Sequence, residues 1–269
     1  MVFQFALTAC SATSAIAAES VVEDIAFRAA LDGREQRYMR ILPPGFDKQQ
    51  PHDVLIALHG HGSDRRQFAE NNRDECRSAR DIAKKYDMIF ISPDYRATTS
   101  WMGPAAEADV VQIIQDLKKR YAVRHVIISG ASMGGTSCLT FAALHPELVD
   151  GIVSMNGTAN HVEYQNFQDA IAASFGGTKQ QVPEEYKKRS AELHVEKLTM
   201  PIACTTGGLD KSVPPDSVLR MMEALKKQSR PVLLLHRPTG GHATNYADGV
   251  EAYEFVIGKL REKQSKGQQ

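Results

Sequence analysis

The chain has 269 residues, of which 42% are hydrophobic and 24% are charged, and its 32 basic side chains balance its 32 acidic ones. This composition excludes a disordered chain, which would carry few apolar residues and a large net charge. The balanced charge also argues against a general nucleic-acid binder, which needs an excess of Lys and Arg. The length suits one large α/β domain or two smaller ones.

The first segment, MVFQFALTACSATSAIAAES, is apolar, rich in small residues and uncharged before Glu19. Its Ala15-Ile16-Ala17 resembles a signal-peptide cleavage site, so we expect residues 1–18 to be an export signal and the protein to be periplasmic or extracellular. The segment is too short and too rich in Ala, Ser and Thr to predict a membrane span. Two alternatives stay open: a lipoprotein lipidated at Cys10, or a tail that is not exported, since the usual basic start is missing.

After the leader, short apolar runs alternate with amphipathic segments, which predicts a mostly parallel sheet with helices on both faces. The first two strands should pair as a hairpin that turns at Asp32-Gly33. Residues 158–200 are far longer than a usual connection, and we expect a partly helical insertion there, a candidate cap in an otherwise single domain over 19–269. The expected strands are 21–30, 35–42, 54–58, 88–91, 126–129, 151–155, 201–206 and 232–236, and the expected helices are 66–86, 104–120, 134–144, 215–228 and 246–260.

Gly130-Ala131-Ser132-Met133-Gly134 fits the pattern G-x-S-x-G between an expected strand and an expected helix. Such a tight turn forces the serine backbone into a strained conformation, which only small flanking residues allow, and exposes the hydroxyl above the sheet. The motif therefore predicts Ser132 as a nucleophile.

A nucleophilic serine needs a base and a carboxylate that orients the base. Asp210 follows the expected strand 201–206, and His242 follows the last one, both in glycine-rich loops. The order Ser132, Asp210, His242 is the order of a strand-end triad in this kind of sheet.

A tetrahedral intermediate also needs two N–H groups aimed at its oxyanion. We expect the amides of Met133 and His61, with Gly62 as the alternative to His61. His59 and His61 form too weak a pattern for a metal pair, and no metal or cofactor is expected. The thiols of Cys76, Cys138 and Cys204 are expected to be buried, with one disulfide as the alternative.

Other residues that follow strands could line the substrate pocket. Tyr95 and Trp101 lie after a central strand, at the carboxyl edge where ligands bind in α/β sheets. Trp101 could stack on a sugar or aryl group, or it could be a packing residue. His161, at the start of the insertion, and Gly62 complete the expected substrate contacts.

The segments LHGHGSD, GASMGG, GGLDKSVPP and TGGHATNY resemble the oxyanion, nucleophile, acid and base segments of the α/β-hydrolase superfamily. Within it, the chain is similar to small serine esterases of the esterase-D-like and feruloyl-esterase-like kinds, to exported bacterial hydrolases, and to prolyl-oligopeptidase-family hydrolases without a propeller. The resemblance implies the triad and the oxyanion amides named above. Dienelactone hydrolases are disfavoured, because they carry Cys where this chain has Ser132.

These features give three hypotheses. The first is a serine esterase that acts on a small-molecule or polysaccharide-linked ester, such as an acetyl or feruloyl ester of carbohydrate. The second is an exported serine peptidase or amidase, and the third is an inactive hydrolase fold that serves as a binding module. No nucleic-acid partner and no membrane span are expected, and the sequence predicts no oligomeric state.

Overall fold

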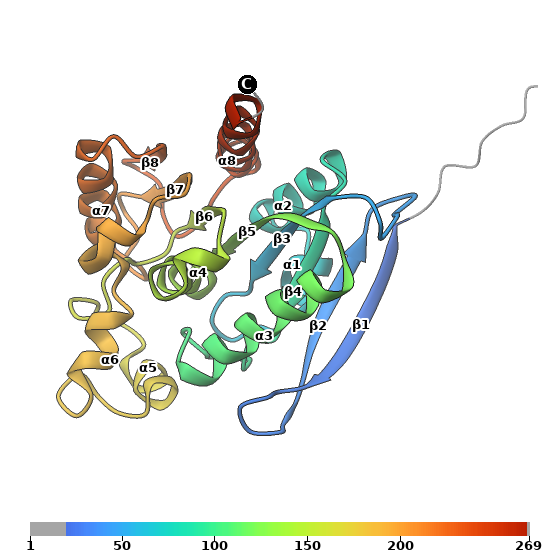
Figure 1. Ribbon diagram of the computed structural model, residues 1–269. Helices are drawn as coiled ribbons and strands as arrows, with labels where there is room; N and C mark the ends of the chain where they lie inside the picture. Colours follow the sequence, from blue (N-terminus) through green and yellow to red (C-terminus); the bar gives the residue numbers. More distant parts are fainter. Residues whose placement is uncertain (1–19, 268–269) are drawn as a thin grey trace, which may run out of the picture.

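Eight strands form one sheet in the order β1-β2-β4-β3-β5-β6-β7-β8 (Figure 1). The computed structural model describes residues 20–267. The expected export signal and Cys10 lie outside these residues. The strands are β1 Val21–Arg28, β2 Glu35–Leu42, β3 His52–Leu58, β4 Ile89–Pro93, β5 Val123–Ala131, β6 Gly151–Met155, β7 Ile202–Gly207 and β8 Val232–Arg237.

The antiparallel start of the sheet and its parallel remainder agree with the expectation from the sequence. β1 and β2 form an antiparallel hairpin, β2 joins β4 antiparallel, and the strands from β4 through β3 to β8 are parallel. Central strands such as Ile89–Pro93 and Gly151–Met155 are buried along their whole length. Both faces of these strands are therefore covered, which explains their continuous apolar sequences.

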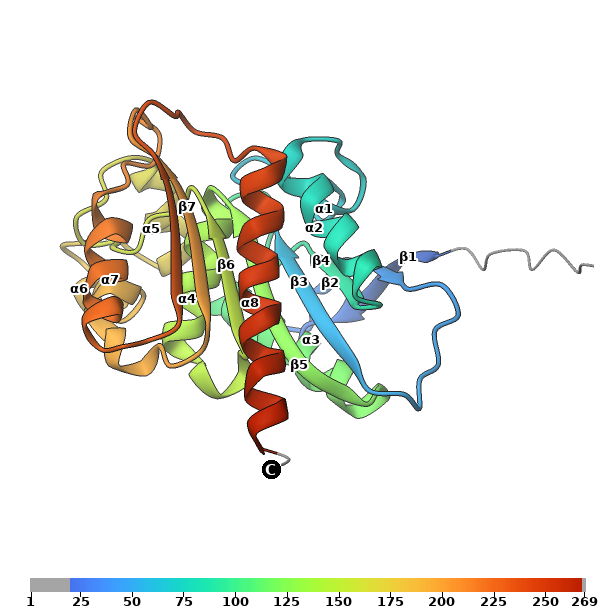
Figure 2. The same cartoon turned by 90° about the horizontal axis from the view of Figure 1, so that it is seen from above.

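Helices cover the two faces of the sheet as two separate layers. One face carries α1 Arg66–Glu70, α2 Asp74–Lys85 and the long α8 Tyr246–Gly267, which crosses the sheet in Figure 2. The other face carries α3 Pro104–Arg120, α4 Met133–Leu144 and α7 Asp216–Lys227. Amphipathic sequences such as that of α3, with its apolar stripe on the sheet side, build both cores.

The long connection between β6 and β7 contains α5 Gln168–Phe175, α6 Pro183–Lys188 and, within Ala191–Lys197, a 3-10 segment that is kinked at His194. Its apolar side chains, among them Ile171, Phe175 and Tyr186, belong to the same core as α3, α4 and α7. The segment is partly helical, as expected. It packs beside α4 and α7 on one face of the sheet (Figure 1), and only its N-terminal part reaches the site described below.

Two helix boundaries differ from the expectation. The helix expected over 66–86 is broken at Asn71–Arg73, because these residues leave the helical conformation and separate α1 from α2. The last helix continues to Gly267 rather than ending near 260. In residues 20–267, no helix is both long and apolar enough to cross a membrane.

Candidate active site

Ser132 occupies the sharp turn between β5 and α4. Its backbone angles are φ 58° and ψ −120°, which is strained for a residue with a side chain. The turn can close only because glycines lie two residues before and two residues after Ser132: a Cβ on Gly134 would lie 1.9 Å from the carbonyl oxygen of Leu58, and a Cβ on Gly130 would lie 2.5 Å from the carbonyl carbon of Gly134. The small residues of the motif thus place the hydroxyl at the carboxyl edge of the sheet.

The structure brings the three residues of the expected triad together. The Nε2 atom of His242 lies 2.8 Å from Ser132 Oγ, and its Nδ1 atom lies 2.6 Å from Asp210 Oδ2. The other carboxylate oxygen of Asp210 accepts hydrogen bonds of 2.9 Å from the amides of Ser212 and Val213. The buried Asp210 is thereby fixed by its own loop and directs one oxygen at the imidazole.

Two backbone amides next to the serine are free to donate. Met133 N–H is the first amide of α4, and His61 lies in the loop after β3; neither has an acceptor in the part of the chain that the structure describes. The Gly62 amide, the alternative donor, already bonds to the carbonyl oxygen of Thr98 at 2.8 Å. The amides of Met133 and His61 are thus available to an oxyanion, whereas the amide of Gly62 is not.

The loop after β3 is braced from several sides. Gln67 Oε1 accepts the Gly60 N–H at 2.7 Å, and the Tyr95 hydroxyl donates to the carbonyl oxygen of His59 at 2.6 Å. The two ring nitrogens of the buried His59 lie 2.8 and 3.0 Å from the carbonyl oxygens of Gly60 and Asp94. His59 is thus a bracing residue, and its nitrogens are occupied.

Four expected substrate contacts are corrected by the structure. Tyr95, Trp101 and His161 are each at most 1% exposed and lie outside the lining of the cavity at Ser132, as does Gly62. Trp101 instead donates from Nε1 to His61 Nδ1 at 3.2 Å. Burial, together with the nearby charge of Arg189, lowers the pKa of His161 to about 3. Ring packing of Tyr95 on His59 and of Trp101 on His161, with centroids 4.6 and 6.4 Å apart, helps to bury these three side chains.

A cavity of about 250 Å³ opens over Ser132 and His242. Several of its residues were missed from the sequence, because they come from elements far apart in the chain and carry no motif. α2 and the segment before it contribute Arg73 and Glu75, and the insertion contributes Phe167. The remaining lining residues are Gly60, His61, Gln67, Ala131, Asn156, Ser212, Ala243 and Thr244.

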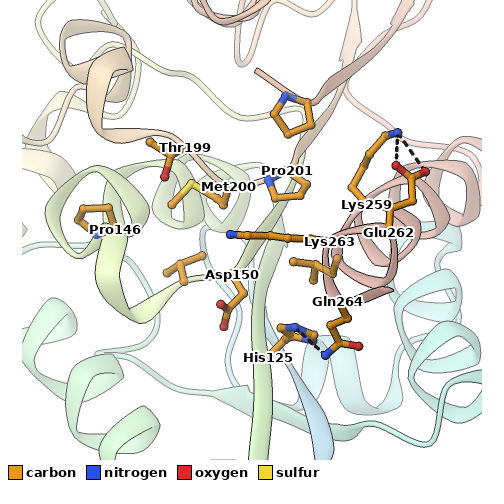
Figure 3. Close-up of a pocket in the computed structure, with 13 residues that line it drawn as sticks. His125, Pro146, Asp150, Thr199, Met200, Pro201, Lys259, Glu262, Lys263 and Gln264 are labelled. Carbon is orange, nitrogen blue, oxygen red and sulfur yellow. Dashed lines mark hydrogen bonds and ion pairs between the residues drawn. The ribbon is translucent and has the colours of Figure 1, made fainter. Parts of the chain in front are cut away.

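A larger cavity of about 680 Å³ lies at the amino ends of the parallel strands, away from the triad (Figure 3). His125, Asp150, Met200 and the last turns of α8 surround it, and Lys259 pairs with Glu262 at its rim. Its lining holds no serine with a histidine partner, so the chemistry assigns the candidate site to the smaller cavity.

Cys76, Cys138 and Cys204 are free, buried thiols, and the disulfide alternative is wrong for them.

The sheet, the strained serine turn and the Ser-His-Asp arrangement define an α/β-hydrolase fold with the site of the serine hydrolases. A model of the prolyl oligopeptidase family matches residues 95–258, the segment that holds Ser132, Asp210 and His242. The chain belongs to the prolyl oligopeptidase family. A comparison with curated protein sequences finds no match.

Solved structures share the fold at low sequence identity. A puromycin-hydrolysing peptidase of Mycobacterium tuberculosis matches with a TM-score of 0.70 and 17% identity over 90% of this chain and 40% of its own. A ferulic acid esterase matches with a TM-score of 0.67 and 17% identity over 89% of this chain and 98% of its own. FphF, a fluorophosphonate-binding serine hydrolase of Staphylococcus aureus, matches with a TM-score of 0.66 and 17% identity over 90% of this chain and 98% of its own. The chain spans 36–42% of the length of the peptidases that it matches.

Proposed function

We propose that the protein is a serine hydrolase that cleaves carboxylic esters through an acyl-enzyme. The observation that carries the proposal is the continuous chain of hydrogen bonds from Ser132 Oγ through His242 to Asp210, at 2.8 and 2.6 Å. The match to the ferulic acid esterase over 98% of that chain supports the ester substrate.

In the proposed reaction, His242 Nε2 takes the proton of Ser132 as Oγ attacks the ester carbonyl carbon. The negative charge that develops on the carbonyl oxygen is held by the amides of Met133 and His61. Collapse of the intermediate breaks the bond to the alcohol, which leaves with the proton from His242. Water, deprotonated by the same histidine, then releases the acid and restores Ser132. Asp210 holds the imidazole in the orientation that both steps need.

The test is hydrolysis of p-nitrophenyl esters, acetate through octanoate plus ferulate, with labelling by a fluorophosphonate probe. We expect turnover of the short esters, and we expect Ser132→Ala to lower kcat by about four to six orders of magnitude and to abolish labelling. Ser265→Ala, an exposed serine on α8, is the matched control and should do neither. Labelling without ester turnover would move the proposal to the amide substrates of the peptidase relatives, and matched anilides would then be tested. Absence of both would favour an inactive binding module.

We also propose that the protein is exported and acts on esters carried by a polysaccharide. The support for export is the apolar leader with its Ala15-Ile16-Ala17 pattern, and the polysaccharide substrate follows by analogy, since an exported esterase meets esters attached to polymers. Mass spectrometry of the protein purified from its source checks this: a mature chain that begins near Glu19 supports export, and an intact Met1 contradicts it. A lipidated N-terminus at Cys10 would indicate a membrane-anchored form.

A further inference from the structure

The imidazole of His61 is held between aromatic rings at the wall of the catalytic cavity. Its ring centroid lies 4.6 Å from that of Phe167 and 5.9 Å from that of Trp101. Phe167 lies just before α5 and Trp101 in the loop before α3, so two distant segments clamp one ring. Trp101 is fully buried, whereas Phe167 is 40% exposed at the cavity. The imidazole therefore has one packed edge and one open edge.

The contact with Trp101 decides where the imidazole carries its proton. The indole Nε1 can only donate a hydrogen bond, and it lies 3.2 Å from His61 Nδ1. Nδ1 must accept and so carries no proton. Burial lowers the pKa of His61, so the ring is neutral at pH 7. The proton of the neutral ring is consequently on Nε2.

The Nε2–H group of His61 has no acceptor among the residues that the structure describes. None of residues 20–267 bonds to it, and it is not among the buried polar atoms that lack a partner. It therefore remains accessible, and the half-buried His61 opens on the cavity that also holds Ser132. The rings that fix it belong to the insertion and to the loop before α3, and none belongs to α4, whose first amide is the other oxyanion donor.

We infer that His61 Nε2–H is a specificity donor for the acyl half of the substrate, selecting acyl groups that carry an uncharged oxygen acceptor near the carbonyl carbon. The exposed ring of Phe167 packs against the carbon atoms of the same group. The inference rests on the proposed ester function, because it assigns the acyl side of that site. The His61 backbone amide and its side chain thus have separate tasks: the amide faces the oxyanion, and the ring reads the acyl group.

Two p-nitrophenyl esters of almost equal size test this inference. The butyrate has a methylene group where the methoxyacetate has an ether oxygen. The quantity measured is the ratio of kcat/KM for methoxyacetate to kcat/KM for butyrate, which cancels any effect of a variant on the oxyanion hole. We expect His61→Leu to lower this ratio about 5- to 10-fold, the effect of one neutral hydrogen bond. His61→Gln, which can place an N–H group near the position of Nε2, should restore most of it.

Two further variants complete the design. Trp101→Phe keeps a ring but removes the indole donor, so the imidazole is no longer confined to one tautomer and the ratio should fall. His194→Leu, a partly exposed histidine outside the cavity, should leave the ratio unchanged. Circular dichroism and fluorophosphonate labelling verify that each variant folds. An equal loss on both esters in His61→Leu would overturn the inference and assign the ring to the oxyanion.

The failure of the ester function is distinguishable from the failure of this inference. If the wild type hydrolyses neither ester, the proposed function fails, and the same comparison is made with p-nitrophenyl phosphonates that carry a propyl or a methoxymethyl group. These phosphonylate the serine whatever leaving group the enzyme prefers. A larger loss with the methoxymethyl compound in His61→Leu then supports the acyl-group donor, and an equal loss overturns it.

Discussion

Asn156 accepts a hydrogen bond of 2.6 Å on its Oδ1 from the hydroxyl of Thr244. Its amide nitrogen lies 3.5 Å from the carbonyl oxygen of Gly241. The carboxamide of Asn156 therefore contacts one residue before and one residue after His242. Thr244 is held in turn by Thr205 at the end of β7, at 2.6 Å. The position of the imidazole relative to Ser132 thus depends on a side chain at the end of a neighbouring strand.

We expect Asn156→Gly to lower kcat on p-nitrophenyl esters about 10- to 100-fold with a smaller change in KM, because a displaced base impairs the chemical step. The backbone of Asn156 has φ 50°, so Asn156→Ala adds strain that glycine avoids. If Asn156→Gly keeps the wild-type kcat and only Asn156→Ala is impaired, the hydrogen bonds do not position His242.

Two glycines within helices should respond in opposite directions to the same substitution. A Cβ on Gly134 would lie 1.9 Å from the carbonyl oxygen of Leu58, whereas a Cβ on Gly258 in α8 would meet nothing within 4 Å. We expect Gly134→Ala to lower the free energy of unfolding by about 3 kcal/mol and to abolish activity. Gly258→Ala should raise it by about 0.5–1 kcal/mol, because alanine favours the helix. Urea unfolding measures the free energy of unfolding of both variants. If Gly134→Ala is as stable as the wild type, a Cβ at this position does not clash with Leu58.

Much of the sheet and the triad could be predicted from the sequence. Apolar runs bounded by glycine and proline predict the strands. Ser132, Asp210 and His242 each follow a strand at the same edge of the sheet, so the fold alone is enough to bring them together. The break between α1 and α2 was missed, although the polar run Asn71–Arg73, with its two turn-favouring asparagines, marks it in the sequence. The end of α8 was missed because its last turns are polar and carry no periodic signal.

The cavity wall was the least predictable part of the site. A tryptophan in a loop has the same sequence signal whether it stacks on a ligand or supports a neighbour, and burial alone separates the two for Trp101. Phe167 reaches the cavity from an insertion whose path is set by packing against α3 and α4. Arg73 lies at the start of α2, and its approach to Ser132 depends on the tertiary arrangement.

Arg189 fastens the insertion to α3, and its removal should loosen that segment. The guanidinium is fully buried and lies 2.7 Å from Glu107 Oε2 and 2.8 Å from the carbonyl oxygen of Met102. Arg189→Met leaves Glu107 with only His145, at 2.9 Å, as its partner and removes the donor to the Met102 carbonyl oxygen, so we expect it to cost about 3 kcal/mol of stability. Limited proteolysis should then cut within 176–182, between α5 and α6.

Lys188→Met removes a more exposed pair with Glu185 and should change stability by less than about 1 kcal/mol. Rapid cleavage of the wild type at 176–182 would show that the segment is already mobile.

Asp53 should make the stability depend on pH in the acid range. Its side chain is 6% exposed, and its carboxylate lies 2.8 Å from Arg124 Nε and 2.9 Å from His125 Nδ1. Burial alone would raise the pKa of Asp53, but the hydrogen bonds from His125 and Arg124 outweigh it and lower the pKa from 3.8 to about 2. The folded state thus binds this proton less readily than the unfolded state. The resulting stabilisation is complete above the unfolded pKa and is lost as the pH falls toward about 2.

Urea unfolding of the wild type and of Asp53→Asn between pH 6 and pH 2 checks the Asp53 prediction. The depressed pKa corresponds to about 2 kcal/mol, so the wild type should be more stable by roughly that amount at pH 6, and the difference should shrink below about pH 4. Asp116→Asn removes an exposed pair with Lys119 at 3.4 Å and should change the stability by less than about 1 kcal/mol at any of these pH values. An ionised group with a depressed pKa must lose its contribution to stability on protonation. If the stability difference between the wild type and Asp53→Asn stays constant down to pH 2, the carboxylate therefore contributes through packing and neutral hydrogen bonds instead.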